Sequence, residues 1–533
     1  MKTLLYFPII SKYIDRKQRS RLRLINKGYR QIKNEGISDL PLRLKNILSK
    51  VKLDDSYLSK FLLRRNGFDV ELSLRQYLTE RVLSLSFNKS ILYSIGSNTL
   101  LRHPLPLEWR NALIEEGIEV DNFKSALLWR MFSLFYWAKG VLYGLKNILP
   151  LLKKQPYLGN YAYFSDLSDK CVSNDINRKN ILNWYLQWNI TVEEIDSVCH
   201  SVNGVSNSKL ARLEIVKTDG LPYLKGTNVF RYGVFVIYAS IYSFVYSIFQ
   251  PVNGIFLAEI LKTKRVDLAS DNDLARDYLF HNSTPFYRPI WTYFAEERGS
   301  RILFYFYSTG HENFEMKGCY PLQDSWHLIS WPYYLVWDKF QMNFVKRFDQ
   351  HKSIIEEVGF IWFSSSGVFE SNSKGAIAVF DVTPHRPTRY AYMGAYYEYY
   401  IFDIANQFLI DIQFVLNCNN IVMAHKMKRI NKFAHKKYIR RVRRLNKKSY
   451  YIEVNPSMDA TQVIQKTKAC ISMPFTSTAL IAKLEGKPSV YYDPSGTVQK
   501  DSRAAHGIPV LSGIDELKGW IENINKDKIF SDS

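Results

Sequence analysis

Short apolar runs recur along the last third of the chain, separated by longer segments of mixed polarity. Five of them have the length and composition of strands: Ala376–Phe380, Asn420–Met423, Tyr450–Val454, Ala469–Ser472 and Ser489–Tyr492. Amphipathic stretches near Tyr397–Leu416 and at Ile514–Ile524 predict helices. Strands that alternate with helices are typical of a doubly wound parallel sheet. We therefore predict a Rossmann-like domain over residues 366–533.

The preceding residues show a less regular pattern. Mixed helical periodicity surrounds two predicted strands, Ser90–Ile95 and Arg301–Tyr307, and an aromatic helix is predicted near Trp331–Phe348. A chain of 533 residues is long enough for two domains, each with its own core. We predict that residues 1–365 form a separate domain with basic and aromatic helices.

One segment is unusually apolar. No charged residue occurs from Tyr232 to Ala258, and Tyr232–Phe249 approaches the roughly 20 apolar residues that a membrane span needs. Its many Tyr and Ser residues, and the break at Gln250–Gly254, argue against a span. We expect a buried helix of the domain, with an interfacial helix and a membrane span as the alternatives.

A hydroxyl-rich turn, Met473–Thr478, joins the predicted strand Ala469–Ser472 to a predicted helix at Ala479–Glu485. In a right-handed βαβ unit this turn lies at the carboxyl edge of the sheet, where free backbone N–H groups and the helix dipole favour an anion. Thr476, Ser477 and Thr478 are therefore candidate phosphate ligands. The alternative is a plain N-cap, because Ser and Thr often begin helices.

The other predicted strands also end in polar residues. If the sheet is parallel, the strand ends bring cations, hydroxyls and turn backbone to one crevice, which suits a phosphate. The further candidates for donor binding are Arg386, His425, Lys426, Arg429 and Asp493. The sequence has no GxGxxG after the first strand, no P-loop, and no Cys/His cluster at metal-ligand spacing, so we expect neither cofactor nor metal.

Charge adds a partner class to this picture. The net charge is +22, and no acidic residue lies between Asp411 and Glu453, where twelve Lys and Arg residues fall. Such a balance indicates an anionic partner: a membrane surface, a nucleotide-linked substrate or a nucleic acid. Five widely spaced cysteines indicate a reduced, cytoplasmic protein. The first apolar stretch, Leu4–Ile10, precedes the positive charges, so no secretory signal is expected.

Two runs around the hydroxyl turn, Ile471–Leu480 and Gly486–Pro494, resemble the PFTS-motif family of bacterial polysaccharide-biosynthesis proteins. Further similar segments are Ala505–Ile508, Trp291–Tyr293, Phe304–Thr309, Val379–Val382 and Lys426–Arg429. The resemblance covers about residues 280–520. It implies an α/β fold of two facing Rossmann-like domains (GT-B type), with additional helices in the N-terminal domain. The C-terminal domain would then bind a nucleotide-sugar donor.

The layout also resembles transferases of CMP-activated sugars such as sialic acids or Kdo. That resemblance assigns CMP binding to His425 and Lys426 and to Thr476, Ser477 and Thr478. The ribose-binding Glu of many UDP-sugar enzymes is replaced by Ile481, which favours a CMP-linked donor. An inverting transferase needs a base on the acceptor side. CMP-sialic-acid transferases use an acidic-acidic-Gly motif, which the segment Glu296–Gly299 resembles incompletely, so the resemblance makes Glu297 the first candidate. His311, just after a strand, is the second, and a retaining mechanism is the alternative.

The sequence thus predicts a glycosyltransferase that acts on a surface polysaccharide or a lipid-linked glycan. We expect it at the inner face of the cytoplasmic membrane, bound peripherally to the anionic surface. A CDP-glycerol-type phosphotransferase of polymer synthesis is an alternative, because it would share the two-domain layout. Nucleic-acid binding is suggested by charge alone, without a reading motif, and is not expected.

Overall fold

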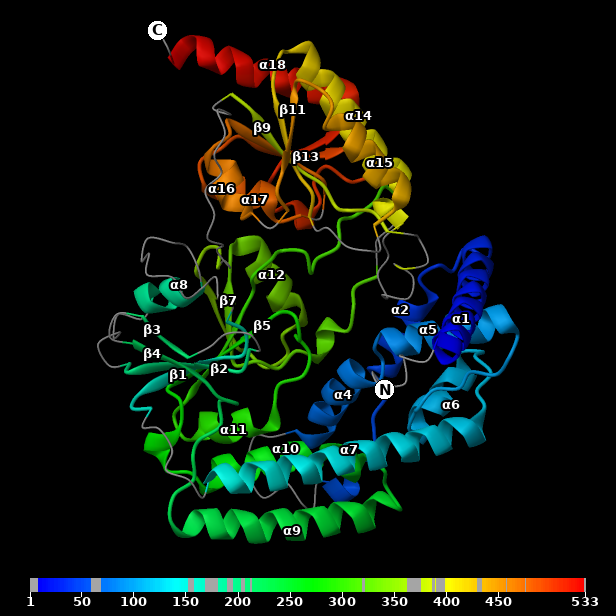
Figure 1. Cartoon of the computed structure of the whole chain (residues 1–533), viewed down its shortest axis with the longest axis vertical. Helices are drawn as coiled ribbons and strands as arrows, with labels where there is room; N and C mark the ends of the chain where they lie inside the picture. Colours follow the sequence, from blue (N-terminus) through cyan, green and yellow to red (C-terminus); the bar gives the residue numbers. More distant parts are fainter. Residues whose placement is uncertain are drawn as a thin grey trace.

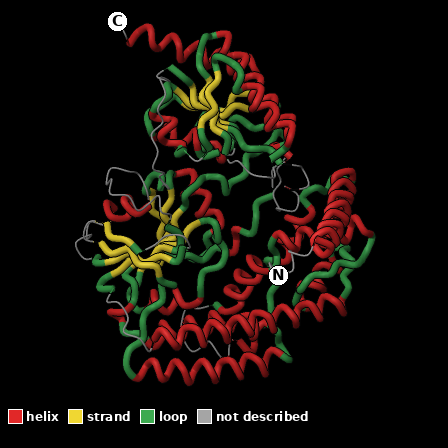
Figure 2. The backbone as a smooth tube through the Cα atoms, viewed as in Figure 1, coloured by secondary structure: helices red, strands yellow, loops and turns green. Residues whose placement is uncertain are grey.

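The computed structural model describes residues 8–58, 69–151, 158–167, 181–188, 195–202, 207–210, 213–318, 322–361, 375–385, 389, 398–428, 434–456, 458–474 and 476–531. Two sheets, each flanked by helices, lie one above the other in Figure 1, and Figure 2 shows the strands of both. A group of helices extends from the lower, N-terminal sheet, and long helices run beneath it.

The C-terminal sheet contains six parallel strands in the order β11-β10-β9-β12-β13-β14. In chain order this is 3-2-1-4-5-6, the arrangement of a dinucleotide-binding Rossmann fold, with the switch point between β9 and β12. The strands are β9 (Ile377–Phe380), β10 (Met423–Lys426), β11 (Tyr451–Val454), β12 (Ala469–Ser472), β13 (Ser489–Asp493) and β14 (Val510–Ser512). The helices are α14 (Phe402–Cys418), α15 (Lys436–Leu445), α16 (Ala460–Gln465), α17 (Thr478–Leu484) and α18 (Ile514–Ser531).

The N-terminal sheet contains eight strands in the order β3-β4-β2-β1-β5-β6-β7-β8. Seven are parallel and again form the 3-2-1-4-5-6 series with one strand added, while β3 pairs with β4 antiparallel at one edge. The strands are β1 (Tyr161–Phe164), β2 (Ser197–His200), β3 (Ser208–Leu210), β4 (Leu213–Lys217), β5 (Asp277–His281), β6 (Arg301–Tyr305), β7 (Tyr333–Val336) and β8 (Ile354–Glu357).

The helices of the N-terminal part are α1 (Pro8–Asn34), α2 (Leu40–Leu48), α4 (Val70–Arg81), α5 (Leu85–Ser97), α6 (Leu107–Glu115), α7 (Asn122–Leu151), α8 (Ile181–Trp188), α9 (Thr227–Ser247), α10 (Val252–Leu268), α11 (Ile290–Glu297) and α12 (Lys339–Phe348). The predicted strand Ser90–Ile95 is wrong, because these residues belong to α5. Gly96 lets α5 pack closely against α1, because a Cβ at this position would lie 2.0 Å from the Leu24 carbonyl oxygen of α1. The predicted aromatic helix begins later than expected, since β7 precedes α12.

The expected fold class is confirmed: two facing α/β domains of Rossmann type, the GT-B layout, with additional N-terminal helices. The predicted domain boundary at residues 365 and 366 lies outside the described residues and stays a prediction. The predicted strand Asn420–Met423 lies three residues further on, as β10. His425 and Lys426 are therefore inside the sheet and not in the loop after it.

The apolar segment Tyr232–Phe249 forms most of α9, and the expectation of a buried helix is wrong. Only 22% of its most apolar 18-residue window is buried. By length and composition α9 could cross a membrane. In Figure 1 it runs beside α7 and α10 at the bottom of the molecule.

Candidate functional site

The hydroxyl turn follows β12 and lies at the switch point of the C-terminal sheet. Its threonines are bonded locally: Thr476 Oγ1 donates to the Met473 carbonyl at 2.8 Å, and Thr478 Oγ1 lies 2.7 Å from Ser472 Oγ. Ser477 occupies the N-cap position of α17, yet within the described residues its hydroxyl makes no capping hydrogen bond. The simple N-cap alternative therefore does not account for any of the three hydroxyls.

Ser477 instead connects the two domains. Its Oγ accepts a hydrogen bond from the Thr309 N–H at 3.0 Å and lies 3.0 Å from Thr309 Oγ1. Thr309 follows β6, as Ser477 follows β12, so both residues stand at carboxyl ends of parallel strands. The carboxyl edges of the two sheets therefore face each other across one interface.

Further contacts hold this interface. His506 Nδ1 lies 2.7 Å from an Asp338 carboxylate oxygen, and Arg503 pairs with Glu315 at 3.0 Å. Met316 and Val498 form an antiparallel β-bridge, in which the Lys317 N–H donates to the Thr497 carbonyl at 2.7 Å. The loop after β6 and the loop after β13 thus share backbone hydrogen bonds.

His425 belongs to a buried polar cluster inside the C-terminal sheet. Its Nδ1 lies 2.7 Å from the Tyr451 hydroxyl, and its Nε2 lies 3.1 Å from Asp381 Oδ2. The Tyr438 hydroxyl donates to the same Asp381 oxygen. Burial, followed by the Asp381 charge, raises the pKa of Tyr438 well above its ordinary value, so this hydroxyl keeps its proton. His425 is fully buried, which argues for a structural role in this arrangement.

Of the other predicted donor residues, Asp493 and Lys426 are placed. The buried Asp493 carboxylate accepts from Tyr399 Oη at 2.9 Å, from Ser495 Oγ at 2.6 Å and from the Val498 N–H at 2.8 Å. It therefore shapes the loop after β13. Lys426 ends β10 and is largely buried. Arg386 and Arg429 lie outside the described residues.

A cavity of about 530 Å³ opens at the carboxyl edge of the N-terminal sheet, beside the loops after β5 and β6. We call this edge the N-terminal edge. Amide and hydroxyl groups line it together with aromatic rings; they include Asn282, Ser283, Thr284, Phe286, Tyr307, Ser308, His311, Asn313 and Trp326. Because Ser308 and Gly310 flank Thr309, the cavity reaches the interdomain contact. Such a lining, with many hydrogen-bonding groups and a few aromatic faces, suits a polyhydroxylated ligand.

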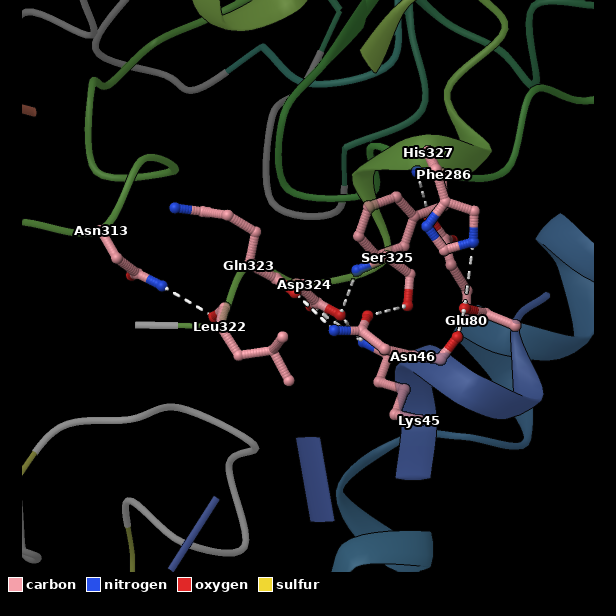
Figure 3. Close-up of polar contacts among 11 residues, drawn as sticks. Lys45, Asn46, Glu80, Phe286, Asn313, Leu322, Gln323, Asp324, Ser325 and His327 are labelled. Carbon is pink, nitrogen blue, oxygen red and sulfur yellow. Dashed lines mark hydrogen bonds and ion pairs between the residues drawn. The ribbon is translucent and has the colours of Figure 1, made fainter. Parts of the chain in front are cut away.

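Helix α2 of the N-terminal part supports one wall of the cavity. Lys45 on α2 pairs with Asp324 at 2.8 Å, and the Asn46 side-chain amide donates to the Gln323 carbonyl, as Figure 3 shows. On the opposite side of the same loop, Asn313 donates to the Leu322 carbonyl at 3.1 Å. These bonds hold the wall of the cavity in place.

Glu80, at the end of α4, is a carboxylate that lines this cavity and is held in a defined position. Its Oε1 accepts hydrogen bonds from the backbone N–H groups of Phe286 at 2.9 Å and of Tyr287 at 3.0 Å. Burial raises the pKa of the Glu80 carboxyl above its ordinary value, although these two donors oppose the shift. A fixed carboxylate with a raised pKa is well suited to accept a proton.

His311 also lines the cavity, inside a cage of aromatic rings. Its ring centroid lies 4.8 Å from that of Phe306 and 4.3 Å from that of Phe344. Burial, and then the nearby charges of His506 and Arg347, lower the pKa of His311 well below its ordinary value. Its ring is thus neutral and a weak proton acceptor. Glu80 has the better geometry and the better pKa for a base.

Comparison with known proteins assigns the chain to a family. The description "Polysaccharide biosynthesis PFTS motif protein" matches residues 235–521, more than half of the sequence. The chain belongs to this family. The match includes both facing sheet edges and the hydroxyl turn, in which Pro474, Thr476 and Ser477 are letters of the motif that gives the family its name. No curated protein matches the sequence.

Some solved structures share part of the fold. The wall teichoic acid polymerase TagF is 9% identical, with 73% of this chain and 88% of TagF covered, and a TM-score of 0.37. A UDP-forming trehalose-phosphate synthase from Burkholderia xenovorans is 9% identical over 69% of this chain and 91% of its own, with a TM-score of 0.34. MnaA of S. aureus, solved with UDP, is 8% identical, with 69% of this chain and 88% of MnaA covered, and a TM-score of 0.35. TM-scores this low carry no inference about activity.

Glu297, the first base candidate, is placed away from the site of this PFTS-motif protein. It ends α11, and β6 begins four residues later at Arg301. Glu297 thus lies at the amino edge of the sheet, opposite the cavity, with an exposed side chain. The structure does not bring it together with His311. The sequence does not point to Glu80, because it lies on a helix more than 200 residues before the loop that it contacts.

Metal ligands can be assessed for the described part of the chain. Among those residues, no group of three or more His, Cys, Asp or Glu side chains is placed to hold a metal ion. Cys199, Cys418 and Cys470 are free thiols.

Proposed function

We propose that the protein is a glycosyltransferase, which moves a sugar from a nucleotide-sugar donor to a growing surface polysaccharide or a lipid-linked glycan. One observation carries the proposal: the carboxyl edges of two Rossmann-like sheets face each other, and a cavity with a polar and aromatic lining opens within the N-terminal part, next to their contact at Thr309. Ligands of such sheets bind at this edge. Membership of a polysaccharide-biosynthesis family agrees with that reaction class.

The carboxyl edge of the C-terminal sheet, which we call the C-terminal edge, is the proposed donor side. The switch point between β9 and β12 is where a doubly wound sheet accommodates a nucleotide phosphate, and Lys426 and the turn at Thr476 lie beside it. We propose a CMP-linked donor, such as a nonulosonic acid or Kdo. Ile481 supports this choice, because its buried apolar side chain offers no carboxylate to a ribose.

The N-terminal cavity is the proposed acceptor side. Its amides and hydroxyls can bind sugar hydroxyls, while Phe286 and Trp326 offer apolar ring faces. Glu80 would take the proton of the acceptor hydroxyl as that oxygen attacks the anomeric carbon of the donor. The bond between this carbon and the phosphate oxygen then breaks, and the nucleotide leaves with the electron pair. A nearby cation such as Lys426 would stabilise its negative charge.

A donor screen tests the proposal. Purified protein is incubated with a panel of CMP-, UDP- and GDP-sugars and with CDP-glycerol, and the released nucleotide is measured with and without a glycan acceptor. We expect release of CMP from a CMP-sugar and mass growth of the acceptor by one glycosyl unit. A product joined by a phosphodiester would instead identify a CDP-glycerol-type phosphotransferase. Failure to release nucleotide from the whole panel would overturn the proposal.

A further inference from the structure

Two adjacent helices expose an unusually large apolar surface. We call it the apolar face; it consists of Phe123, Leu127, Met131, Leu134, Phe135, Leu142 and Leu145 on α7, and of Phe230, Val234, Ile237, Tyr238, Ile241, Phe244 and Val245 on α9. Phe123 is 77% exposed and Phe230 is 76% exposed. Soluble proteins rarely leave so many large apolar side chains together in water, and such a surface indicates an interaction site.

The exposure follows the helical repeat, so it is not an accident of loose packing. On α9, Phe230, Val234, Ile237 and Ile241 are separated by three or four residues and share one side. The opposite side of α9 is buried, with Tyr232, Val236, Ala239 and Ser243 facing the protein. Each helix thus has a packed side and a free apolar side.

Close packing fixes both helices to the protein. A Cβ on Gly144 of α7 would lie 2.6 Å from a Val236 methyl group of α9, so the two helices approach closely there. The Trp137 indole N–H donates to the Ser240 carbonyl at 2.9 Å. In Figures 1 and 2 the two helices run side by side at one end of the molecule. They therefore present one surface.

The charges on the two helices have a single sign, and one of them, Lys124, pairs with Asp121 just before α7 at 3.3 Å. The two helices carry five basic residues, all exposed, and their sequences contain no Asp or Glu. These residues are Lys124, Arg130, Lys139, Lys146 and Arg231. Apolar side chains bordered by cations are complementary to a bilayer surface with anionic headgroups. In a symmetric contact with a second copy, the same cations would face each other, which disfavours a dimer.

We propose that α7 and α9 lie in the surface of an anionic lipid bilayer, with the apolar face inserted among the headgroups and upper acyl chains. α9 lies in the bilayer surface and does not cross it, because its other side is packed on α7 and on α10. This proposal does not depend on the reaction that the protein catalyses.

Vesicle flotation tests the proposal with the full-length protein. Vesicles of phosphatidylcholine with a minor fraction of phosphatidylglycerol are compared with vesicles of phosphatidylcholine alone. The double substitution Ile237→Glu and Ile241→Glu should lower binding to the anionic vesicles about tenfold or more, because two carboxylates would enter an apolar layer. The control Phe414→Glu, at a 53% exposed position on α14, should bind like the wild type. Leu142→Glu on α7 provides an independent variant.

A charge reversal tests the role of the cations. Lys139→Glu with Lys146→Glu should weaken binding to anionic vesicles and leave binding to phosphatidylcholine unchanged. The matched control, Lys447→Glu with Lys448→Glu, changes the net charge equally at the end of α15, away from the face. Equal losses in both pairs would show that net charge alone drives binding and would overturn the assignment to this face.

Light scattering in solution completes the set. We expect a monomer for the wild type and for the Ile237→Glu, Ile241→Glu variant. The proposal would be overturned in favour of a second copy by two results together. These are a wild-type dimer that becomes a monomer in this variant, and no binding of the wild type to either kind of vesicle.

Discussion

The two facing sheet edges differ in how their polar groups are used. At the C-terminal edge, Asp493 bonds to its own loop, and Asp381 lies beside His425 and accepts a hydrogen bond from Tyr438. At the N-terminal edge, hydroxyls, amides and Glu80 surround a cavity of about 530 Å³. Polar residues of the first edge hold the fold together in this arrangement, whereas those of the second are directed at a space that a ligand can enter.

This difference separates two kinds of mutational effect. Substitutions at the N-terminal edge should reduce turnover with little loss of stability. Substitutions in the buried clusters of the C-terminal edge should reduce stability first. The chemistry of a strand end therefore depends on whether its side chains find partners within their own domain, and residue type alone does not reveal that.

The largest effect is expected at Glu80. Glu80→Gln keeps an oxygen that can accept the two backbone hydrogen bonds but cannot take a proton, so kcat should fall about 10²- to 10⁴-fold with little change in KM. Because burial raises the pKa of this carboxyl, wild-type kcat should fall as the pH drops through a value above that of an ordinary Glu.

Two variants serve as controls for that experiment. Glu71→Gln, on the same helix but paired with Arg75, should leave kcat unchanged. His311→Phe fits the aromatic cage and should retain turnover. A large loss of kcat in His311→Phe, with normal turnover in Glu80→Gln, would reverse the assignment of the base.

An intermediate effect is expected in the buried cluster. Tyr438→Phe removes a donor from the Asp381 carboxylate, whose other oxygen has no partner among the described residues, and should cost about 3 kcal/mol of unfolding free energy. Tyr451→Phe, which removes a bond to an imidazole, should cost about 1 kcal/mol. Urea denaturation measures both. Weaker CMP binding at unchanged stability in Tyr438→Phe would show that this cluster serves the donor and not the fold.

The smallest effect is expected at the interdomain contact. Ser477→Ala and Thr309→Ala each remove the same hydrogen-bonded pair, so the double variant should show a coupling energy of about 1 kcal/mol in urea denaturation. As a control, the double variant of Ser477→Ala with Ser353→Ala, at a distant position, should show no coupling energy. If Ser477→Ala lowers CMP affinity while Thr309→Ala does not, Ser477 binds the donor directly, and polar groups of both edges serve a ligand.

Local patterns predicted the region around the hydroxyl turn well. Ala469–Ser472, the turn and the helix after it were expected within one residue of β12 and α17, because an apolar run, hydroxyls and Gly486 punctuate the chain clearly. The predicted position of β10 is three residues too early, because His425 and Lys426 are residue types typical of a loop. Their burial depends on Tyr451 and Asp381, which the sequence alone does not place beside them.

The prediction and the structure also differ at Ser90–Ile95 and at α9, again because contacts between distant segments decide the outcome. Ser90–Ile95 is an apolar run too short to distinguish helix from strand, and its glycine neighbour was informative only once α1 was packed against it. The composition of α9 predicted burial, yet the protein covers only one side of this helix. Composition reports affinity for an apolar environment, and that environment need not be the protein interior.

The backbone bridge between Met316 and Val498 has a mechanical consequence. Because the two domains share hydrogen bonds there, this end of the interface resists separation more than the contact between single side chains at Ser477 and Thr309. If the domains move apart, the bridge is the natural pivot, and the gap widens first at the hydroxyl turn. The PFTS segment would then act as the mouth of a hinged clamp, with its axis in the loop that follows β13.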